Sequence, residues 1–162
     1  MTNCKDKLLM NSLSNYYIHQ KNIYKVLPIL QGRTKISLRI LDWFVTNYCK
    51  NNTVSILNKK IDHYNVHLDY KAQLKAYSKK LFDPFCRRNR ILFYYDDTNY
   101  ITTTVGQLNF FKWALDNNIL EFVLNNIKTI ENDMNNNINK YMSVIATKKL
   151  TKKNIDIIIE FN

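Results

Sequence analysis

Residues 69–90 read DYKAQLKAYSKKLFDPFCRRNR, and this stretch decides more about the fold than any other part of the chain. Its apolar side chains recur every three or four residues, at Tyr70, Leu74, Tyr77 and Leu81. This spacing predicts a helix over residues 70–82 with one apolar face. Asp69 is the expected N-cap of that helix. Pro84 disfavours helical geometry at Asp83, so we expect the helix to end there.

Cationic side chains occupy the other side of this predicted helix and the segment after it. Three lysines fall four residues apart and share a helix face. Lysine and the planar guanidinium of arginine both bind phosphate groups. The sequence therefore predicts a nucleic-acid-binding surface, for DNA or RNA, made by Lys71, Lys75, Lys79, Lys80, Arg87, Arg88 and Arg90. The alternative, that these side chains are simply solvated, stays open.

Charge is unevenly distributed along the chain, whose 162 residues carry a net charge of +11. Residues 1–90 hold 17 Lys and Arg against 5 Asp and Glu, a net +12. Residues 91–162 hold 7 against 8, a net −1. Such segregation favours one basic face on the N-terminal half, which suits a polyanionic partner.

Several functional classes find no support in the sequence. No apolar run reaches the length of a membrane span, so we expect no membrane association. Cys49, His63, His67 and Cys86 match the spacing of no common zinc finger, and no phosphate-binding glycine loop or metalloprotease motif occurs. We therefore expect a non-enzymatic protein with no metal and no cofactor.

The order of predicted elements indicates an α+β fold. A helix over residues 35–50 with Thr34 as N-cap, a strand at residues 54–57, and a β-hairpin formed by residues 91–95 and 100–103 surround the quoted stretch. A winged-helix order is a candidate topology, with residues 70–82 as the recognition helix. It requires a further helix near residues 59–63, and its acidic tip at residues 96–99 would repel phosphates.

The rest of the chain is predicted to be helical with less regular ends. Thr104 and Gln107 match a capping box that begins a helix ending near Asp116. A long amphipathic helix follows, with apolar residues at three- or four-residue steps: Leu120, Val123, Ile127, Ile130, Met134, Ile138 and Tyr141. We expect an N-terminal arm over residues 1–32, frayed over residues 1–14. A single domain over residues 33–142 and a basic linker with a strand-like tail over residues 143–162 complete the chain.

Two further surfaces are candidates for binding. Aromatic side chains near the basic stretch offer stacking platforms for single-stranded bases, although core packing explains most of them better: Tyr70, Tyr77, Phe82, Phe85, Tyr94 and Tyr95. The amphipathic stripe over residues 118–142 supports a rival function, a structural or adaptor protein. On that alternative the partner is a second copy of the chain or another protein.

Three blocks resemble a small conserved family of nucleocytoplasmic large DNA viruses, the mimivirus-like giant viruses. The blocks are residues 37–48, 80–88 and 103–114, and the resemblance covers roughly residues 33–134. It brings no catalytic residues with it. It implies a viral protein in the host cytoplasm, at the viral factory or in the virion. Genome organisation, packaging or transcription is the expected role of its nucleic-acid binding.

Overall fold

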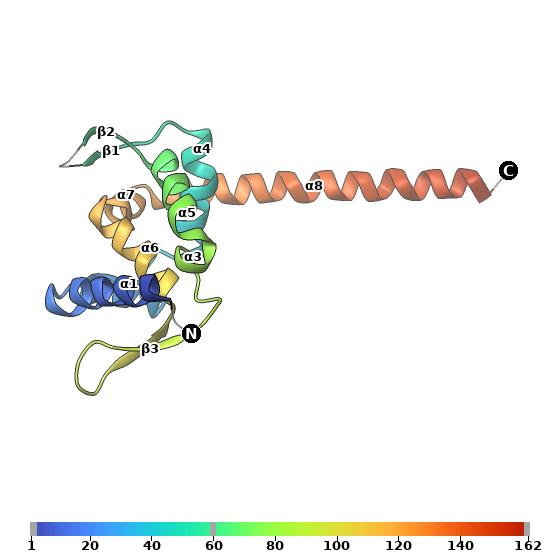
Figure 1. The fold of residues 1–162 in the computed structure, drawn as a ribbon. Helices are drawn as coiled ribbons and strands as arrows, with labels where there is room; N and C mark the ends of the chain where they lie inside the picture. The colour runs from blue at the N-terminus through green and yellow to red at the C-terminus, as the bar shows by residue number, and fades with distance from the viewer. Residues whose placement is uncertain (1–2, 59–60, 161–162) are drawn as a thin grey trace.

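The structure is a computed structural model that describes residues 3–58 and 61–160, with side chains described over residues 3–56 and 64–150. A mainly helical body carries two small hairpins, and one long helix leaves the body (Figure 1). In chain order the elements are α1 Cys4–Ser14, the π-helical η1 Asn15–His19, α2 Ile23–Leu30, α3 Leu38–Trp43, the π-helical η2 Phe44–Tyr48, α4 Cys49–Asn51, β1 Ser55–Asn58, β2 Ile61–Asn65, α5 Val66–Leu81, β3 Ile91–Tyr94, β4 Tyr100–Thr103, α6 Val105–Asp116, α7 Ile119–Asn125 and α8 Ile127–Glu160. The predicted α+β class is confirmed.

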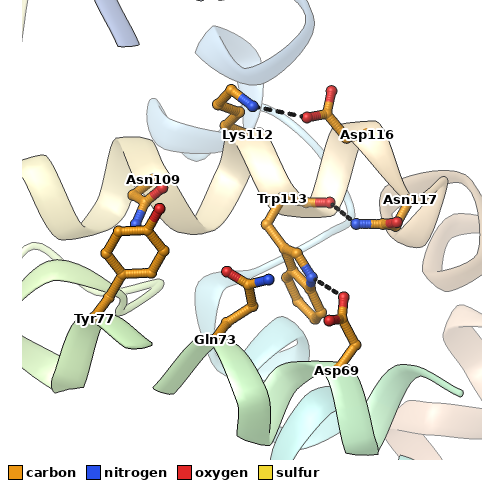
Figure 2. Close-up of a pocket in the computed structure, with 8 residues that line it drawn as sticks. All are labelled: Asp69, Gln73, Tyr77, Asn109, Lys112, Trp113, Asp116 and Asn117. Carbon is orange, nitrogen blue, oxygen red and sulfur yellow. Dashed lines mark hydrogen bonds and ion pairs between the residues drawn. The ribbon is translucent and has the colours of Figure 1, made fainter. Parts of the chain in front are cut away.

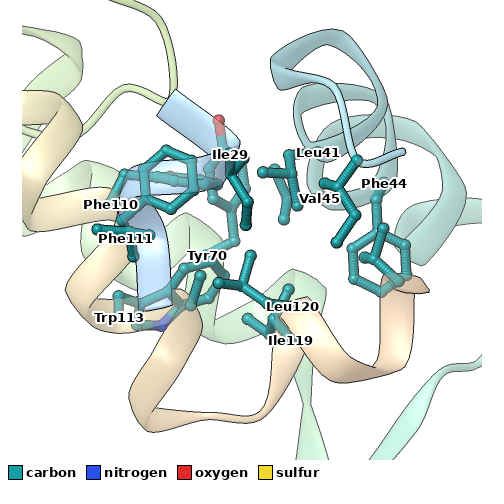
Figure 3. Close-up of a cluster of buried hydrophobic side chains, with 14 of the residues drawn as sticks. Ile29, Leu41, Phe44, Val45, Tyr70, Phe110, Phe111, Trp113, Ile119 and Leu120 are labelled. Carbon is teal, nitrogen blue, oxygen red and sulfur yellow. The ribbon is translucent and has the colours of Figure 1, made fainter. Parts of the chain in front are cut away.

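The core surrounds α6, which is buried on almost every side. Phe110 and Phe111 are fully buried, and Trp113 is nearly so. Their rings lie near those of α5 and its C-cap, with Phe82 packed edge-on against Trp113 at 5.4 Å between centroids. Figure 3 shows side chains of α2, α3, η2, α5 and α7 converging on the same cluster. Because aromatic rings bury large areas, these α6 side chains contribute strongly to the core.

The N-terminal residues join this core, so the prediction of an arm with a frayed start is wrong for the described residues. Leu13 and Tyr17 are fully buried, and Ile23 is almost so. The Tyr17 hydroxyl donates a hydrogen bond to the Leu108 carbonyl at 2.5 Å. Tyr16 and Tyr17 lie three and four residues after Leu13, so the three side chains share one buried helical face. The spacing of this face is present in the sequence, although its packing against α6 is a tertiary contact.

The central helix predicted over residues 35–50 exists, but it begins later. Ser37, rather than Thr34, is the N-cap, and its hydroxyl accepts from the Ile40 amide at 3.1 Å. The helix continues through η2 and α4 to Asn51. Its predicted role in the core is confirmed, because Leu41 and Phe44 are fully buried.

The segment between α4 and α5 differs from a winged helix. The predicted strand is present as β1, and it pairs antiparallel with β2, Ser55 opposite Asn65. Residues 61–63, where the winged-helix order needs a helix, belong to β2, while residues 59–60 lie outside the described part of the chain. The candidate winged-helix topology is therefore not followed.

The second hairpin and the cap of α6 were predicted correctly. Strands β3 and β4 pair antiparallel, with Tyr94 opposite Tyr100. The Thr104 hydroxyl accepts from the Gln107 amide at 3.0 Å, as expected of an N-cap. The other half of the capping box is absent, because the Gln107 side chain donates to the Pro84 carbonyl instead.

The long amphipathic helix is divided at Asn126 into α7 and α8. The C-terminal strand predicted at residues 155–161 is wrong over its described part, because α8 continues to Glu160. A short apolar run fits a strand and a helix equally well, and continuity with α8 decides for the helix. None of the helices described in residues 3–58 and 61–160 is both long and apolar enough to cross a membrane.

Candidate nucleic-acid interface

Helix α5 begins at Val66 rather than at Tyr70, so the prediction that Asp69 caps it is wrong. The Asn65 side chain is the N-cap and accepts from the Leu68 amide at 3.1 Å. The Asp69 carboxylate lies within the first turn and accepts from the Tyr64 hydroxyl at 2.5 Å and from the Trp113 indole at 2.6 Å. Asp69 therefore ties β2 and α6 to α5.

The apolar face predicted for this helix is confirmed, with Tyr70 buried and Leu74 and Tyr77 packed at the edge of the core. All four lysines of the helix, Lys71, Lys75, Lys79 and Lys80, are exposed. Ser78 interrupts the helix with φ 58° and ψ 169°. The break removes Lys79 from the straight row of Lys71 and Lys75. The lysines therefore form two pairs, one on the helix and one at its end.

The start of α6 holds the backbone where α5 ends. The Gln107 side chain donates to the Pro84 carbonyl at 2.8 Å, and the Asn109 side chain donates to the Leu81 carbonyl at 2.8 Å. The Gly106 carbonyl accepts from the Asp83 amide at 3.2 Å. A Cβ at Gly106 would lie 3.0 Å from the Lys80 carbonyl oxygen, so glycine permits this close approach.

These three residues, Gly106, Gln107 and Asn109, are called the α6 clamp below. Sequence reasoning missed the clamp. Its signal was a glycine and two amides in the first turns of a helix whose other residues, apart from Lys112 and Asp116, are apolar. Asn109 satisfies the Leu81 carbonyl, which the end of α5 leaves unpaired, and Gln107 satisfies the buried Pro84 carbonyl in the segment after the helix. The clamp thereby fixes the segment that carries the arginines.

The three arginines are exposed but have different surroundings. Arg87 forms an ion pair with Asp83 at 2.9 Å, and its guanidinium lies 4.9 Å from the centre of the Phe85 ring. The hydrogen bond that Arg87 donates to the Asp83 carboxylate raises the pKa of Arg87. Arg90 donates to the Cys86 carbonyl at 3.3 Å.

Arg88 and Lys80 line one depression of about 300 Å³. Asp6 of α1 also lines it, which opposes anion binding at that edge. The depression joins the end of α5 to the start of β3 through Ile91. In Figure 1 the chain between α5 and β3 descends along one side of the body. The predicted cations therefore follow a path from α5 to the second hairpin.

A polar pocket that sequence reasoning did not predict opens between α5 and α6 (Figure 2). Its volume is about 300 Å³, and it is lined by Asp69, Gln73, Tyr77, Asn109, Lys112, Trp113, Asp116 and Asn117. Lys112 pairs with Asp116 at 3.0 Å, and Asp116 also accepts from the Tyr16 hydroxyl at 2.9 Å. With two carboxylates and one paired ammonium, this pocket disfavours phosphate. On helical spacing, Gln73 and Tyr77 lie on the flank of α5 opposite Lys71 and Lys75.

The residues considered for zinc do not form a group among the described side chains. The His67 ring lies 3.3 Å from the Val45 carbonyl, and Cys49 is buried. His63 lies outside the described side chains. Over residues 3–56 and 64–150, no cluster of three or more potential metal ligands occurs.

Of the aromatic residues considered for base stacking, most pack the core. Tyr70 and Phe82 are buried, and the ring of Tyr77 stacks on Phe82 at 6.5 Å. Tyr94 differs, because 51% of it is exposed. Tyr94 therefore lacks the core role that explains Tyr70, Tyr77 and Phe82.

Comparison with known proteins gives one family and one relative. The family of unknown function DUF7197 matches residues 1–160. Uncharacterized protein L507 of Acanthamoeba polyphaga mimivirus is 44% identical over 142 residues, which cover 83% of this chain and 50% of the relative. The chain thus spans about half the length of the curated relative it matches. No solved structure matches.

Proposed function

We propose that this chain, which belongs to the family of unknown function DUF7197, is a non-enzymatic nucleic-acid-binding protein. The relative of a giant virus supports the expectation of a viral protein. In this proposal the helix α5 and the segment after it contact phosphates. The binding would serve genome organisation, packaging or transcription.

One observation carries the proposal: the basic segment is exposed and mostly uncompensated. All seven predicted cations between Lys71 and Arg90 are exposed. Within the described side chains, Arg87 alone among the seven forms an ion pair. Unpaired exposed cations are solvated at little cost and remain free to replace the counterions of a polyanion.

The backbone near these cations is held by helix α5 and by contacts with α6. Lys71 and Lys75 stand one turn apart, roughly 6 Å along the helix axis. The α6 clamp holds the backbone between Lys80 and Arg87 through the carbonyls of Leu81 and Pro84. A preorganised cation loses less side-chain and backbone entropy when it binds phosphate.

The expected affinity depends steeply on salt. Six unpaired cations predict a slope of log K against log salt of about −4 to −5 as an upper limit, because each neutralised phosphate contributes about −0.7 to −0.9. Binding is therefore best measured by fluorescence anisotropy on labelled oligonucleotides across a salt series.

The decisive variant reverses two charges, K71E together with K75E. We expect its affinity at low salt to fall at least about 10-fold and its salt slope to become shallower by about two. The matched control is K128E with K140E, which changes the net charge equally at exposed positions of α8. Equal losses in both variants would mean that net charge alone drives binding, and absence of binding at low salt would refute the proposal.

A second function has its own supporting observation. The apolar stripe predicted over residues 118–142 is largely occupied in the core of the chain itself, since Leu120, Val123, Ile130 and Met134 are buried. Farther along α8 the apolar side chains are exposed: Tyr141 by 67%, Met142 by 61%, Val144 by 45% and Leu150 by 64%. Exposed apolar side chains on a protruding helix are typical of a protein-docking segment.

The rival proposal is an adaptor or minor virion component whose partner presents an acidic amphipathic helix. Residues 134–150 carry Lys140, Lys148 and Lys149 and no acidic residue. A second copy of α8 in the same direction would place these lysines beside one another, so an acidic partner fits better. Light scattering on the purified protein tests this choice of partner. A monomer agrees with an acidic partner. A dimer that Y141E abolishes would show instead that α8 binds a second copy of the chain.

A further inference from the structure

The outer face of the second hairpin is apolar and exposed. Leu92 is exposed by 56%, Tyr94 by 51% and Tyr100 by 50%. The inner face is anchored, because Phe93 and Ile101 are buried and Phe93 packs edge-on against Tyr17 at 6.1 Å. Since strands alternate their side chains, burying the inner row places the outer row in solvent. Core packing explains the inner row, Phe93 and Ile101, and it does not explain why the outer row is apolar.

Tyr94 and Tyr100 form a pair on that outer face. They are opposite one another across the strands, and their ring centroids lie 5.1 Å apart with an interplanar angle of 47°. Each ring contacts the other and leaves about half of the residue uncovered. Two adjacent half-exposed phenol rings make a platform on which planar groups can stack.

Charge distinguishes the two ends of the hairpin. Arg88 and Arg90 immediately precede β3. Asp96 and Asp97 lie in the turn at the other end, and both are exposed. Asp96 accepts hydrogen bonds from the Thr98 and Asn99 amides and from the Asn99 side chain, which lower its pKa to about 2. Asp96 is therefore an anion at neutral pH, and a polyanion is attracted to the arginine end and repelled from the turn.

We propose that this hairpin binds single-stranded nucleic acid, with bases stacked on Tyr94 and Tyr100 and the backbone toward Arg88 and Arg90. The inference rests on the proposed function and narrows the ligand from nucleic acid in general to single strands. Bases of a duplex are stacked on their neighbours and offer no free face to a side chain, whereas those of a single strand do. Base stacking on aromatic rings tolerates any sequence, which suits a platform without a hydrogen-bonding pocket.

Cations lead from the arginine end of the hairpin to the basic helix. Arg88 shares the depression at the end of α5 with Lys80, and Lys79 precedes Lys80. A strand bound at the hairpin therefore meets further cations as it runs toward α5. Single-strand sites of this type cover about 4–16 nucleotides, so an oligonucleotide of about 12 is a suitable probe.

The test compares oligonucleotides of about 12 nucleotides, single-stranded and duplex, by fluorescence anisotropy at one low salt concentration. The variant is Y94L with Y100L, which removes both rings and keeps apolar side chains at half-exposed positions. We expect single-strand affinity to fall roughly 10-fold to 100-fold and duplex affinity to change less than about 2-fold. Y141L is the matched control, because it removes an exposed ring from α8, and it should change neither.

The outcomes separate this inference from the function on which it rests. If Y94L with Y100L keeps its single-strand affinity while K71E with K75E loses it, the platform is refuted and nucleic-acid binding stands. If the tyrosine variant weakens single-strand and duplex binding equally, selectivity for single strands is refuted. If wild-type protein binds neither oligonucleotide at low salt, the proposed function fails as well. Circular dichroism of each variant confirms that the fold is retained.

Removal of one acid at the turn gives an independent check. Asp97 is exposed and makes no hydrogen bond within the described residues, unlike Asp96. D97N removes a negative charge from the end that repels the backbone. We expect a rise in single-strand affinity of about 2-fold that disappears at high salt. A rise that is independent of salt would contradict the electrostatic part of the inference.

Discussion

Helices α5 and α6 lie against each other and differ in almost every other respect. Most of α6 is buried, including Gln107 and Asn109, whereas α5 buries only Val66 and Tyr70. The buried helix holds the exposed one: Asn109 donates to the Leu81 carbonyl and Trp113 donates to Asp69. The comparison teaches that the candidate interface and the parts that stabilise it occupy neighbouring helices.

This division predicts which substitutions change stability and which change binding. Residues of α6 should affect the free energy of unfolding, and truncation of exposed α5 side chains should leave it almost unchanged. Two pairs of variants and one single variant test this division, and a last pair tests the backbone break in α5. The expected effect decreases from the first test to the last.

The first pair is F111A in α6 and K75A in α5. Phe111 is fully buried, so its truncation should lower the free energy of unfolding by about 3–5 kcal/mol. Lys75 is exposed, and its truncation should change that free energy by less than about 0.5 kcal/mol. Urea denaturation followed by circular dichroism measures both. Similar losses would abolish the distinction between the two helices.

The second pair compares two glutamines. Gln107 accepts from the Thr103 hydroxyl at 2.7 Å and donates to the Pro84 carbonyl, so Q107A leaves buried polar groups unpaired. We expect it to cost about 1–3 kcal/mol of unfolding free energy. Gln73 of α5 lines the polar pocket, and Q73A should cost less than about 0.5 kcal/mol. A costly Q73A would show that α5 also depends on polar contacts.

The third test crowds the contact between the helices. In G106A the new methyl group meets the Lys80 carbonyl oxygen at 3.0 Å and the Leu81 carbonyl carbon at 3.2 Å. Alanine favours a helix by about 1 kcal/mol over glycine, which partly offsets the crowding. We expect a net loss of about 1–2 kcal/mol. An unchanged or raised melting temperature would mean that the end of α5 moves away freely.

The last test concerns the break within α5. At φ 58° and ψ 169°, Ser78 has a backbone conformation that glycine adopts without strain. S78G should therefore raise the free energy of unfolding by about 1 kcal/mol, and S78A should not. Thermal unfolding of the two variants provides the measurement. If S78A stabilises more than S78G, α5 is continuous through this residue in solution.

Local patterns predicted the elements that local forces determine. The apolar row of α5, the β3–β4 hairpin and the Thr104 cap depend on residues within a few positions of one another. The exposure of the seven cations was predicted for the same reason, because lysine and arginine rarely lie inside. Their use in binding stays a proposal.

Tertiary contacts determined what the sequence did not reveal. The buried Tyr17 packs against α6 and donates a hydrogen bond to the carbonyl of Leu108, 91 positions away. The Gln107 backbone amide donates to the Thr104 hydroxyl, as the capping box predicts. Its side chain instead donates to the buried Pro84 carbonyl, which the local pattern does not predict. The α6 clamp and the exposed Tyr94–Tyr100 pair each need two segments in register, and no periodicity within one segment contains that information.

The length of α8 has a hydrodynamic consequence. Its 34 residues span about 51 Å at 1.5 Å per residue, and only its first turns lie against the body (Figure 1). A body with a protruding rod diffuses more slowly than a sphere of equal mass. A single chain should therefore elute early from a gel-filtration column, and a sedimentation velocity experiment should return a high frictional ratio for it.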